Sequence, residues 1–539
     1  MKTINAELLA LMLKSAANNL KNNKKAINDL NIFPVPDGDT GTNMSMTFSG
    51  ALGSISLEEE SCSELVKALS KAALRNARGN SGVILSQIIR GIYKGVGEAE
   101  ELSVEVIKDA AVMAKKSAYD AVMKPTEGTI LTVVRQMAEF AQERYEDYSE
   151  ADEFLFALYE KGNESLSKTP EMLPVLKQAG VVDAGGQGVM TLFEGLVYAL
   201  KEGKAIESEE GEITSSKVVA EVETEIKFLY CTEFLINKKA DRQTAQFTAA
   251  IENLGDCMLV IEDDEIVKVH IHTNHPGRVI EEAIKLGELT NLKIDNMKYQ
   301  HDDKAEKEAE TETVTEEEKE LKKYGFVAVA AGDGLAEIFR SLGADAMVEG
   351  GQTMNPSTQD ILDAVEKVDA ENVFVLPNNK NIILAAEQVD ALTKKNVIVL
   401  PTKNIPTGIS AIMGFDESLS PEENAENMMG MASGVTCGQL TFAARDTEVD
   451  GVEIHEGDIM GLSPNGIEVV GDDLPSCAVE LIDSLVTEDS GVISVYYGAG
   501  VSEADANALL EELEEKYKDM DVALYYGGQP VYYYIVSVE

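Results

Sequence analysis

Basic residues are scarce in this chain. Among its 539 residues, 46 Lys and Arg stand against 95 Asp and Glu, which gives a formal net charge of −49. Nucleic acids and anionic membranes are bound through clustered Lys and Arg, so this charge argues against both as partners. No stretch approaches the roughly 20 apolar residues that a membrane-spanning helix needs. The first residues also lack the apolar core of a signal peptide.

Cysteines are few as well. The chain has five, an odd number without the spacing of a disulfide framework, which fits a reducing compartment. We therefore expect a cytoplasmic protein with no membrane span and no nucleic-acid partner.

The length predicts about three or four domains, because one hydrophobic core rarely serves more than about 250–300 residues. The strongest break is at residues 302–320, which hold ten acids and three lysines. Such a segment has no apolar face to bury, so we interpret it as a solvated linker. A weaker polar stretch follows residue 202. We expect domains at 1–202, 220–300 and 321–539, with linkers at 203–219 and 301–320.

The three segments differ in their hydrophobic periodicity. The first has apolar residues at helical spacing and no alternating strand pattern, which predicts an all-α domain. The last alternates short strands with helical runs, which predicts an α/β layer with a parallel sheet. The middle segment has the order βαββαβ of a ferredoxin-like α+β domain, in which the first and third strands are neighbours. Its expected elements are Phe228–Ile236, Arg242–Leu254, Met258–Glu262, Ile266–Thr273, Pro276–Leu286 and Leu292–Tyr299.

The most informative motif is PVPDGDTGTNM at residues 34–44. Its two prolines stiffen the chain, and Gly38 and Gly41 allow backbone angles closed to other residues, so Asp37 and Asp39 can converge on one point. Paired carboxylates suit Mg²⁺, which completes its shell with phosphate oxygens and water. The alternative is an ordinary Asp-Gly turn in which Asp39 caps the following helix.

Three further glycine turns precede apolar helices. They read RGNSG at residues 78–82, KPTEGT at 124–129 and VDAGGQG at 182–188. A turn of this kind leaves free N–H groups beside the positive end of a helix dipole, which favours phosphate. Any one of them could equally be a helix cap or a tight crossing. Four such turns in one helical segment favour a nucleotide site.

Together, the four motifs resemble the nucleotide-binding L subunit of dihydroxyacetone kinase; they are PDGDTGTNM, RGNSG, KPTEGT and VDAGGQG. The form they resemble is the one found at the N-terminus of FakA, the kinase component of bacterial fatty acid kinase. The later segments match the FakA family in order, and the resemblance spans essentially the whole chain. It implies a multidomain protein with an N-terminal all-α helical barrel that binds ATP and Mg²⁺ at its open end. It also implies that the last segment is a DegV-like α/β domain.

The resemblance also implies the roles of single residues. Asp37 and Asp39 become catalytic residues and Mg²⁺ ligands. In the sugar-kinase subunit three aspartates hold the metals, and the first of them aligns with Asn31, whose amide oxygen supplies less charge. The implied nucleotide-binding residues are Thr40, Asn43, Met44, Ser81, Gly82, Gly128, Thr129, Ile130, Asp183 and Gly185.

A second metal motif lies in the middle segment. In KVHIH, His270 and His272 share one face of the expected strand, and Cys231 lies on the neighbouring first strand. Thiolate and imidazole select Zn²⁺, and Glu233 shares the face of Cys231 as a further ligand or hydrogen-bond partner. The alternative is two histidines on a polar sheet face. The FakA family is described with zinc on a matching Cys and His-x-His, which implies Cys231, His270 and His272 as ligands.

Polar turns at strand ends mark the last segment. They lie at residues 331–334, 352–357, 376–381 and 401–403. Ligands favour the carboxyl ends of parallel strands, but these turns serve equally well as plain connections, and no nucleophile–base pair is evident. The DegV-like resemblance implies a docking surface for a partner and no lipid pocket of its own.

The predicted function is that of an ATP-dependent fatty acid kinase. Its acceptor is the carboxylate of a fatty acid presented by a separate fatty-acid-binding protein of the DegV family, and its product is an acyl phosphate for phospholipid synthesis. A carboxylate is already an anionic nucleophile, so positioning and charge neutralisation suffice. The family also leads us to expect a homodimer. Two alternatives stay open: a dihydroxyacetone-type small-molecule kinase, and a nucleotide-sensing scaffold without phosphoryl transfer.

The negative charge is unevenly distributed. Residues 321–539 hold 11 basic and 38 acidic residues, a net charge of −27, and the acidic linker adds −7, which leaves −15 for residues 1–301. The acidity therefore concentrates away from the nucleotide domain, where it would repel ATP. We hypothesise a partner with a basic docking face.

Overall fold

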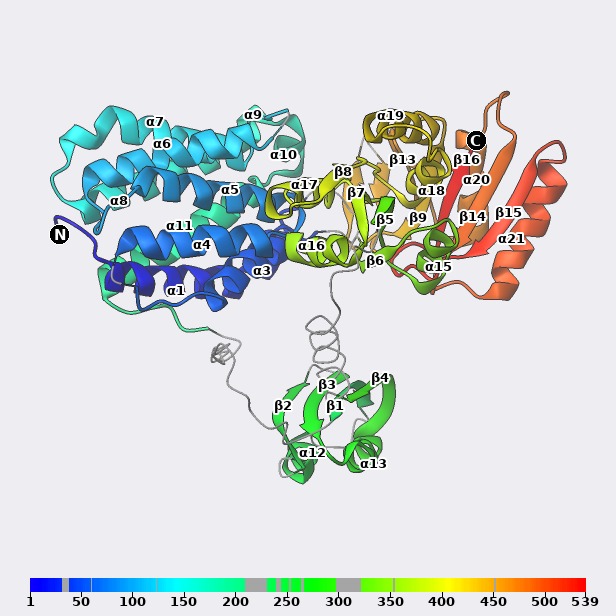
Figure 1. Ribbon diagram of the computed structural model, residues 1–539, viewed down its shortest axis with the longest axis horizontal. Coiled ribbons are helices and arrows are strands. Elements are labelled where there is room, and N and C mark those ends of the chain that lie inside the picture. Colours follow the sequence, from blue (N-terminus) through cyan, green and yellow to red (C-terminus); the bar gives the residue numbers. More distant parts are fainter. Residues whose placement is uncertain are drawn as a thin grey trace. The chain divides into compact units, whose positions relative to one another are not determined.

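The computed structural model divides the chain into two compact units (Figure 1). The first unit combines Met1–Ser215 with Leu321–Glu539, and the second is Ser216–Glu320. The structure describes residues 1–31, 38–59, 61–122, 124–208, 230–238, 244–251, 254–262, 266–296, 321–351, 354–449 and 452–539. Within residues 231–296 it describes only part of the side chains.

The N-terminal part of the first unit is helical, as its periodicity predicts. The helices are α1 (Ala6–Asn22), α2 (Lys24–Asn28), α3 (Thr40–Gly53), α4 (Cys62–Asn76), α5 (Gly79–Val96), α6 (Val104–Asp120), α7 (Ile130–Arg144), α8 (Ala151–Ser167), α9 (Thr169–Met172), α10 (Pro174–Ala179) and α11 (Ala184–Glu202). Their apolar faces meet in one core, which contains an apolar cavity of about 210 Å³. The barrel closure implied by the resemblance stays a prediction.

Helices α5 and α6 pack with their backbones in direct contact. Gly91 and Gly95 lie one turn apart on α5. A Cβ on Gly91 would overlap the carbonyl oxygen of Met113, and one on Gly95 would overlap the backbone of Ala110. Because glycine has no Cβ, the two helices can approach this closely.

The C-terminal part of the first unit contains two main sheets. Its strands are β5 (Lys322–Ala330), β6 (Ala346–Glu349), β7 (Ala370–Leu376), β8 (Asn396–Val399), β9 (Thr436–Phe442), β10 (Thr447–Val449), β11 (Val452–Ile454), β12 (Ile459–Ser463), β13 (Gly466–Gly471), β14 (Val492–Tyr497), β15 (Asp521–Tyr526) and β16 (Tyr534–Val538). Its helices are α15 (Asp333–Ser341), α16 (Thr358–Lys367), α17 (Ile383–Glu387), α18 (Ile405–Met413), α19 (Pro421–Ala432), α20 (Leu474–Leu485) and α21 (Glu503–Lys516).

The first sheet is parallel, with the strand order β6-β5-β7-β8, which confirms the expected α/β layer. Both of its faces are buried, as is usual for parallel sheets. On β5, Phe326 and Ala328 face the core shared with the second sheet, while Val327 and Val329 face α16 and α17. The second sheet has the order β13-β12-β9-β16-β14-β15 and buries its other face against α20 and α21.

The second unit contains β1 (Tyr230–Lys238), α12 (Thr244–Ile251), β2 (Gly255–Glu262), β3 (Ile266–Thr273), α13 (Pro276–Leu286) and β4 (Gly287–Asn296). Its sheet has the order β2-β3-β1-β4, so the first and third strands are neighbours, as the sequence predicts. Val267, Val269 and Ile271 are fully buried in a core with residues of α12 and α13. Strand β4 begins before the expected Leu292. The ferredoxin-like class stays a prediction.

Among the helices that the structure describes, none combines the length and the apolar character needed to cross a membrane.

The α5–α6 contact predicts that a Gly→Ala substitution lowers stability at Gly91, whereas the same substitution raises stability at Gly53. Gly91→Ala should lower stability by about 1–3 kcal/mol, because the added methyl group forces the helices apart. Gly53→Ala, at the exposed end of α3 with no neighbouring atom within 4 Å of its Cβ position, should raise stability by about 0.5–1 kcal/mol. Thermal unfolding of the full chain by circular dichroism measures both. Equal melting temperatures for the two variants would contradict the close contact.

Candidate functional site

The N-terminus of α3 carries the first candidate residues. Asp39 occupies the N-cap position, but its side chain makes no capping hydrogen bond to the helix. The simple helix cap considered from the sequence is therefore not observed. Gly38 lies against Asn31, whose Cβ would be 3.6 Å from a Cβ added to Gly38. The structure thus brings Asn31 beside Gly38, the residue before Asp39, whereas Asp37 lies outside the described residues.

The RGNSG turn packs directly on α3. Gly79 has a positive φ of 57° and lies against the side-chain amide of Asn43, which is only 4% exposed. Gly82, one turn further along α5, lies against the hydroxyl of Thr47. A Cβ at either glycine would overlap these side chains. The two glycines therefore allow the start of α5 to lie beside the start of α3, with Ser81 between them.

The starts of α7 and α11 join the same cluster through Asp183. This carboxylate caps α11 by accepting the backbone N–H of Gly186 at 2.7 Å. Backbone hydrogen bonds from Ile130 at the start of α7 and from Gly185 also stabilise its charged form and lower its pKa. Burial acts the other way and is the largest effect, so the pKa of Asp183 is raised above its ordinary value.

Two further contacts complete the cluster. Met44 of α3 is fully buried, and its sulfur lies against Gly188 of α11. Thr129 caps α7 through the N–H of Leu131, and Gly128 has a positive φ of 83°. Neighbouring contacts thus link the N-terminal ends of α3, α5, α7 and α11. The candidate nucleotide residues, Thr40 included, lie on these four ends.

Within the described part of the structure, two side-chain amide oxygens near this cluster have no hydrogen-bond partner. They are the Oδ1 atoms of Asn80 and Asn355, and both are buried. Side-chain oxygens buried without a partner are costly, so each can accept a hydrogen bond from water or from a bound group. The oxygen-rich set of Asp39 and Asn31, beside four helix N-termini, has the chemistry expected for Mg²⁺ and phosphate groups.

The α/β part of the first unit contacts this cluster directly. Arg78, the residue before the RGNSG glycines, donates from Nη1 to the carbonyl oxygen of Asn355 at 2.9 Å and lies 3.4 Å from the Asp360 carboxylate. The N–H of Thr358 donates to the carbonyl oxygen of Ala77 at 3.1 Å. The sequence flagged residues 352–357 only as a turn at a strand end. Nothing in its local pattern reveals that the turn reaches the start of α5.

The predicted zinc ligands lie in the second unit. The β1–β3 register places Cys231 opposite His272 and Glu233 opposite His270, as adjacent strands allow. The side chains of Cys231, His270 and His272 lie outside the described part of the structure. Within the described part, no group of three or more His, Cys, Asp or Glu side chains is placed to hold a metal. The zinc site therefore stays a prediction.

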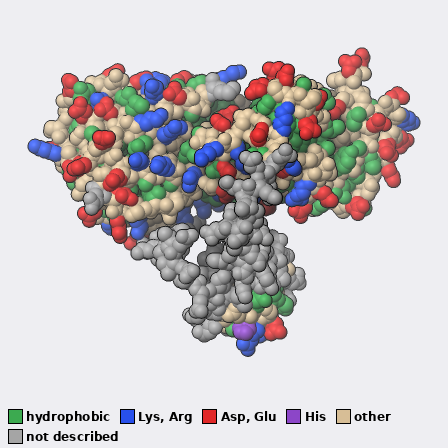
Figure 2. All heavy atoms as spheres, viewed as in Figure 1, with side chains coloured by type: hydrophobic (Ala, Val, Ile, Leu, Met, Phe, Trp, Pro, Cys, Tyr) green, Lys and Arg blue, Asp and Glu red, His purple; other side chains and the backbone are tan. Residues whose placement is uncertain are grey.

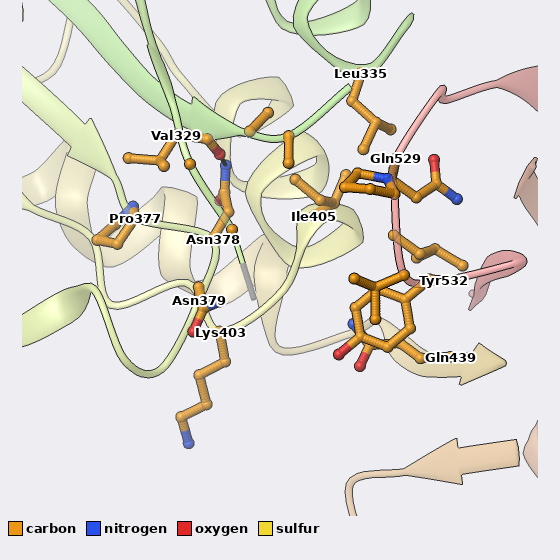
Figure 3. A pocket seen from close by; sticks show the side chains of 17 residues that line it. Val329, Leu335, Pro377, Asn378, Asn379, Lys403, Ile405, Gln439, Gln529 and Tyr532 are labelled. Carbon is orange, nitrogen blue, oxygen red and sulfur yellow. Dashed lines mark hydrogen bonds between the residues drawn. The ribbon is translucent and has the colours of Figure 1, made fainter. Parts of the chain in front are cut away.

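A small cavity lies where strands of the two sheets end (Figure 3). Its volume is about 60 Å³, and it is lined by residues of three of the flagged turns, among them Ala331, Asn378 and Lys403. Asn378 has a positive φ of 54° and is held by a hydrogen bond from its Nδ2 to the carbonyl oxygen of Val329 at 2.9 Å. Pockets for organic ligands usually measure at least about 300 Å³, so this cavity is too small to enclose a fatty acid.

Comparison with known proteins identifies three domains along the chain. Residues 34–198 match the DAK2 domain, residues 227–304 match the FakA-like middle domain of fatty acid kinase, and residues 325–539 match the FakA-like C-terminal domain. An uncharacterized protein of Staphylococcus aureus (strain USA300) is 40% identical over 550 residues, with 99% of each chain covered. An uncharacterized protein of Staphylococcus epidermidis is also 40% identical, over 552 residues and 99% of each chain.

The chain is less similar to the solved structures than to these two sequence relatives. A DegV family fatty-acid-binding protein from Thermus thermophilus has 12% identity and a TM-score of 0.31, and the match covers 40% of this chain and 99% of that one. The dihydroxyacetone kinase of C. freundii in complex with AMP-PNP and Mg²⁺ has 18% identity and a TM-score of 0.27, with 37% and 35% covered. Scores this low add nothing to the assignment.

The helical domain with its four glycine turns is thus a kinase domain of the DAK2 class. The chain as a whole belongs to the FakA family of fatty acid kinase proteins.

The raised pKa of Asp183 predicts a pH effect on stability. The folded chain binds this proton more tightly than the unfolded chain, so the contribution of Asp183 is full below the ordinary pKa of 3.8 and is lost as the pH rises through the raised pKa. Asp183→Asn removes the titration and keeps an oxygen that can cap α11. Wild-type stability relative to this variant should therefore fall as the pH rises above 3.8.

Melting temperatures of both chains along that pH series measure the effect. A constant difference between them would show that the Asp183 carboxylate titrates normally in the folded chain.

Proposed function

We propose that this chain is the ATP-dependent catalytic component of a fatty acid kinase. It transfers a phosphoryl group from ATP to the carboxylate of a fatty acid presented by a DegV-family fatty-acid-binding protein. The observation that carries the proposal is the cluster itself: Asp39 precedes α3, and contacts link the N-terminal ends of α3, α5, α7 and α11. Membership of the FakA family indicates the acceptor.

The proposed reaction makes one bond and breaks one. A carboxylate oxygen of the fatty acid attacks the γ-phosphorus of ATP, and the bond from that phosphorus to the β,γ-bridging oxygen breaks. ADP leaves with the bond electrons, and the product is an acyl phosphate. No proton has to be removed from the nucleophile, so the chain needs no general base.

The residues at the cluster bind and orient the nucleotide. In this proposal the phosphates lie at the positive ends of the helix dipoles, while Asp183 and Thr129 cap the first turns of α11 and α7. Asp39, with Asp37 and Asn31, would hold Mg²⁺, which neutralises phosphate charge when bound. Glycines 79, 82 and 188 keep the helix starts close enough together for this arrangement.

The α/β part serves in this proposal as the docking module. Its strand-end cavity of about 60 Å³ is too small for an acyl chain, which fits a domain that recruits a loaded partner. Zinc at Cys231, His270 and His272, and a homodimer, stay predictions.

The proposal predicts that removal of the Asp39 carboxylate abolishes most of the phosphoryl transfer. Asp39→Ala should lower phosphoryl transfer about a hundredfold or more, because the metal and the phosphate charge lose a ligand. Asp109→Asn removes an exposed acid on α6 of the same domain and should leave the rate unchanged. Acyl phosphate formation with a fatty-acid-loaded partner measures both. Near-normal turnover of Asp39→Ala would refute the site, and no acyl phosphate from the wild type would favour a nucleotide-sensing scaffold.

The charge of the docking module predicts salt-sensitive association. Acidic side chains gather on the α/β part in the face that Figure 2 shows, and exposed acids lie along α19 and α21, among them Glu422, Glu426, Glu511 and Glu515. If the partner docks through a basic face, its Kd should rise several-fold between about 50 mM and 200 mM salt, as surface charges are screened. An equal osmolarity of sucrose should have no effect. A Kd independent of salt would contradict electrostatic docking.

A further inference from the structure

Asn355 belongs to the α/β part of the chain, yet it contacts a residue of the candidate nucleotide site. Its side-chain Nδ2 donates a hydrogen bond to Oδ2 of Asp39 at 2.5 Å. The two residues are 316 positions apart in the sequence. Asn355 is 1% exposed, so water cannot replace this contact without a rearrangement of the turn.

The backbone around Asn355 is held by several contacts. Its carbonyl oxygen accepts the hydrogen bond from Arg78, and Ser357 pairs with Arg78 in an antiparallel bridge. Ser357 also begins α16 with a capping box, in which Ser357 and Asp360 bond each other's backbone N–H groups. The Asn355 side chain thus extends from a segment that is fixed both to α5 and to the start of α16.

The orientation of the Asn355 amide follows from charge. A flipped amide would place its oxygen against the Asp39 carboxylate, which repels it, so Nδ2 faces Asp39. The oxygen, Oδ1, is then left buried without a partner. The amide also lies beside Gly79, because a Cβ on Gly79 would be 3.2 Å from Nδ2. Asn355 therefore touches both the Asp39 turn and the RGNSG turn.

We propose that Asn355 is a positioning residue of the Mg²⁺–nucleotide site. Its Nδ2 fixes the Asp39 carboxylate for metal binding, and its Oδ1 accepts a hydrogen bond from a group that the bound Mg²⁺–nucleotide brings. A carboxylate has about four lone-pair sites, so one donated hydrogen bond orients it without blocking a metal. Outer partners of metal ligands commonly contribute about 10–100-fold to metal affinity.

This inference rests on the proposed function and adds to it. Nucleotide binding in the helical domain depends on a side chain of the docking module. The kinase domain of this chain therefore has a complete metal site only while the α/β module is seated on the start of α5. The part that we expect to recruit the partner then also completes the site for ATP.

The test compares the Mg²⁺ dependence of nucleotide binding in full-length variants, without fatty acid or partner. ADP binding is measured by calorimetry along a series of Mg²⁺ concentrations and in EDTA. Asn355→Ala should raise the Mg²⁺ concentration for half-maximal binding about tenfold and leave binding in EDTA unchanged. Asn355→Asp, of the same shape, should raise it further, because a second carboxylate repels Asp39.

Gln388→Ala is the matched control. Gln388 accepts a side-chain hydrogen bond from Gln87 of α5 at 3.0 Å, so the substitution removes an amide contact between the same two parts of the chain away from Asp39. Its Mg²⁺ dependence should equal that of the wild type. If Asn355→Ala has a lower melting temperature than Gln388→Ala, the Mg²⁺ dependence of Asn355→Asp decides the outcome, because this variant keeps the shape of the side chain.

The inference would be overturned if both Asn355 variants showed the Mg²⁺ dependence of the wild type. It would also be overturned if ADP binding fell as much in EDTA as with Mg²⁺, because such a loss marks a merely structural role. These outcomes are separate from the fate of the kinase proposal. A wild type that binds Mg²⁺–ADP through Asn355 but makes no acyl phosphate refutes the proposed reaction and leaves this inference standing.

Discussion

The seating of the α/β layer on the start of α5 is the interaction on which the candidate site depends. Ala77 and Val83 are buried in the same core as Val327, Val375 and other residues of the parallel sheet and its helices. Hydrogen bonds from Arg78 and from the N–H of Thr358 fix the register of this contact. Because the contact includes Arg78 and Val83, on either side of the RGNSG glycines, the geometry of this turn is set partly by residues far away in the sequence.

The parallel sheet makes this arrangement possible because it is buried on both faces. Alternate residues of β5 enter two separate cores, one shared with the second sheet and one shared with the helical domain. An antiparallel sheet with one solvated face has no such second apolar surface. The second unit, whose sequence lies between the two halves of the first, has a core of its own that includes Val267, Val269 and Ile271.

The sequence predicted local features well and long-range ones poorly. Glycine turns before apolar helices, the helical first segment and the strand pattern of residues 266–273 are set by neighbours in the chain, and the structure has them where they were expected. The grouping of the four helix starts was inferred from the number of turns, and contacts such as Met44 with Gly188 supply the reason.

The contact of Asn355 with Asp39 could not be predicted, since it depends on packing between residues 316 positions apart. A polar turn before α16 was the only signal. The roles of all the candidate metal and nucleotide residues, Asp37, Asp39, Cys231, His270 and His272 among them, stay predictions.

The contact between the α/β layer and the start of α5 can form only late in synthesis, because its two sides lie far apart in the chain. Val83 emerges from the ribosome long before Ile383–Glu387, the helix α17 that packs over the start of α5. At about 5–20 residues per second, the roughly 300 residues between them take about 15–60 s to make. During that time the nascent helical domain can fold, but the apolar surface at Ala77 and Val83 has no cover from its own chain. A growing chain of this protein therefore exposes an apolar patch beside the RGNSG turn, and it acquires both the cover of that patch and Asn355 only when the α/β layer has been made.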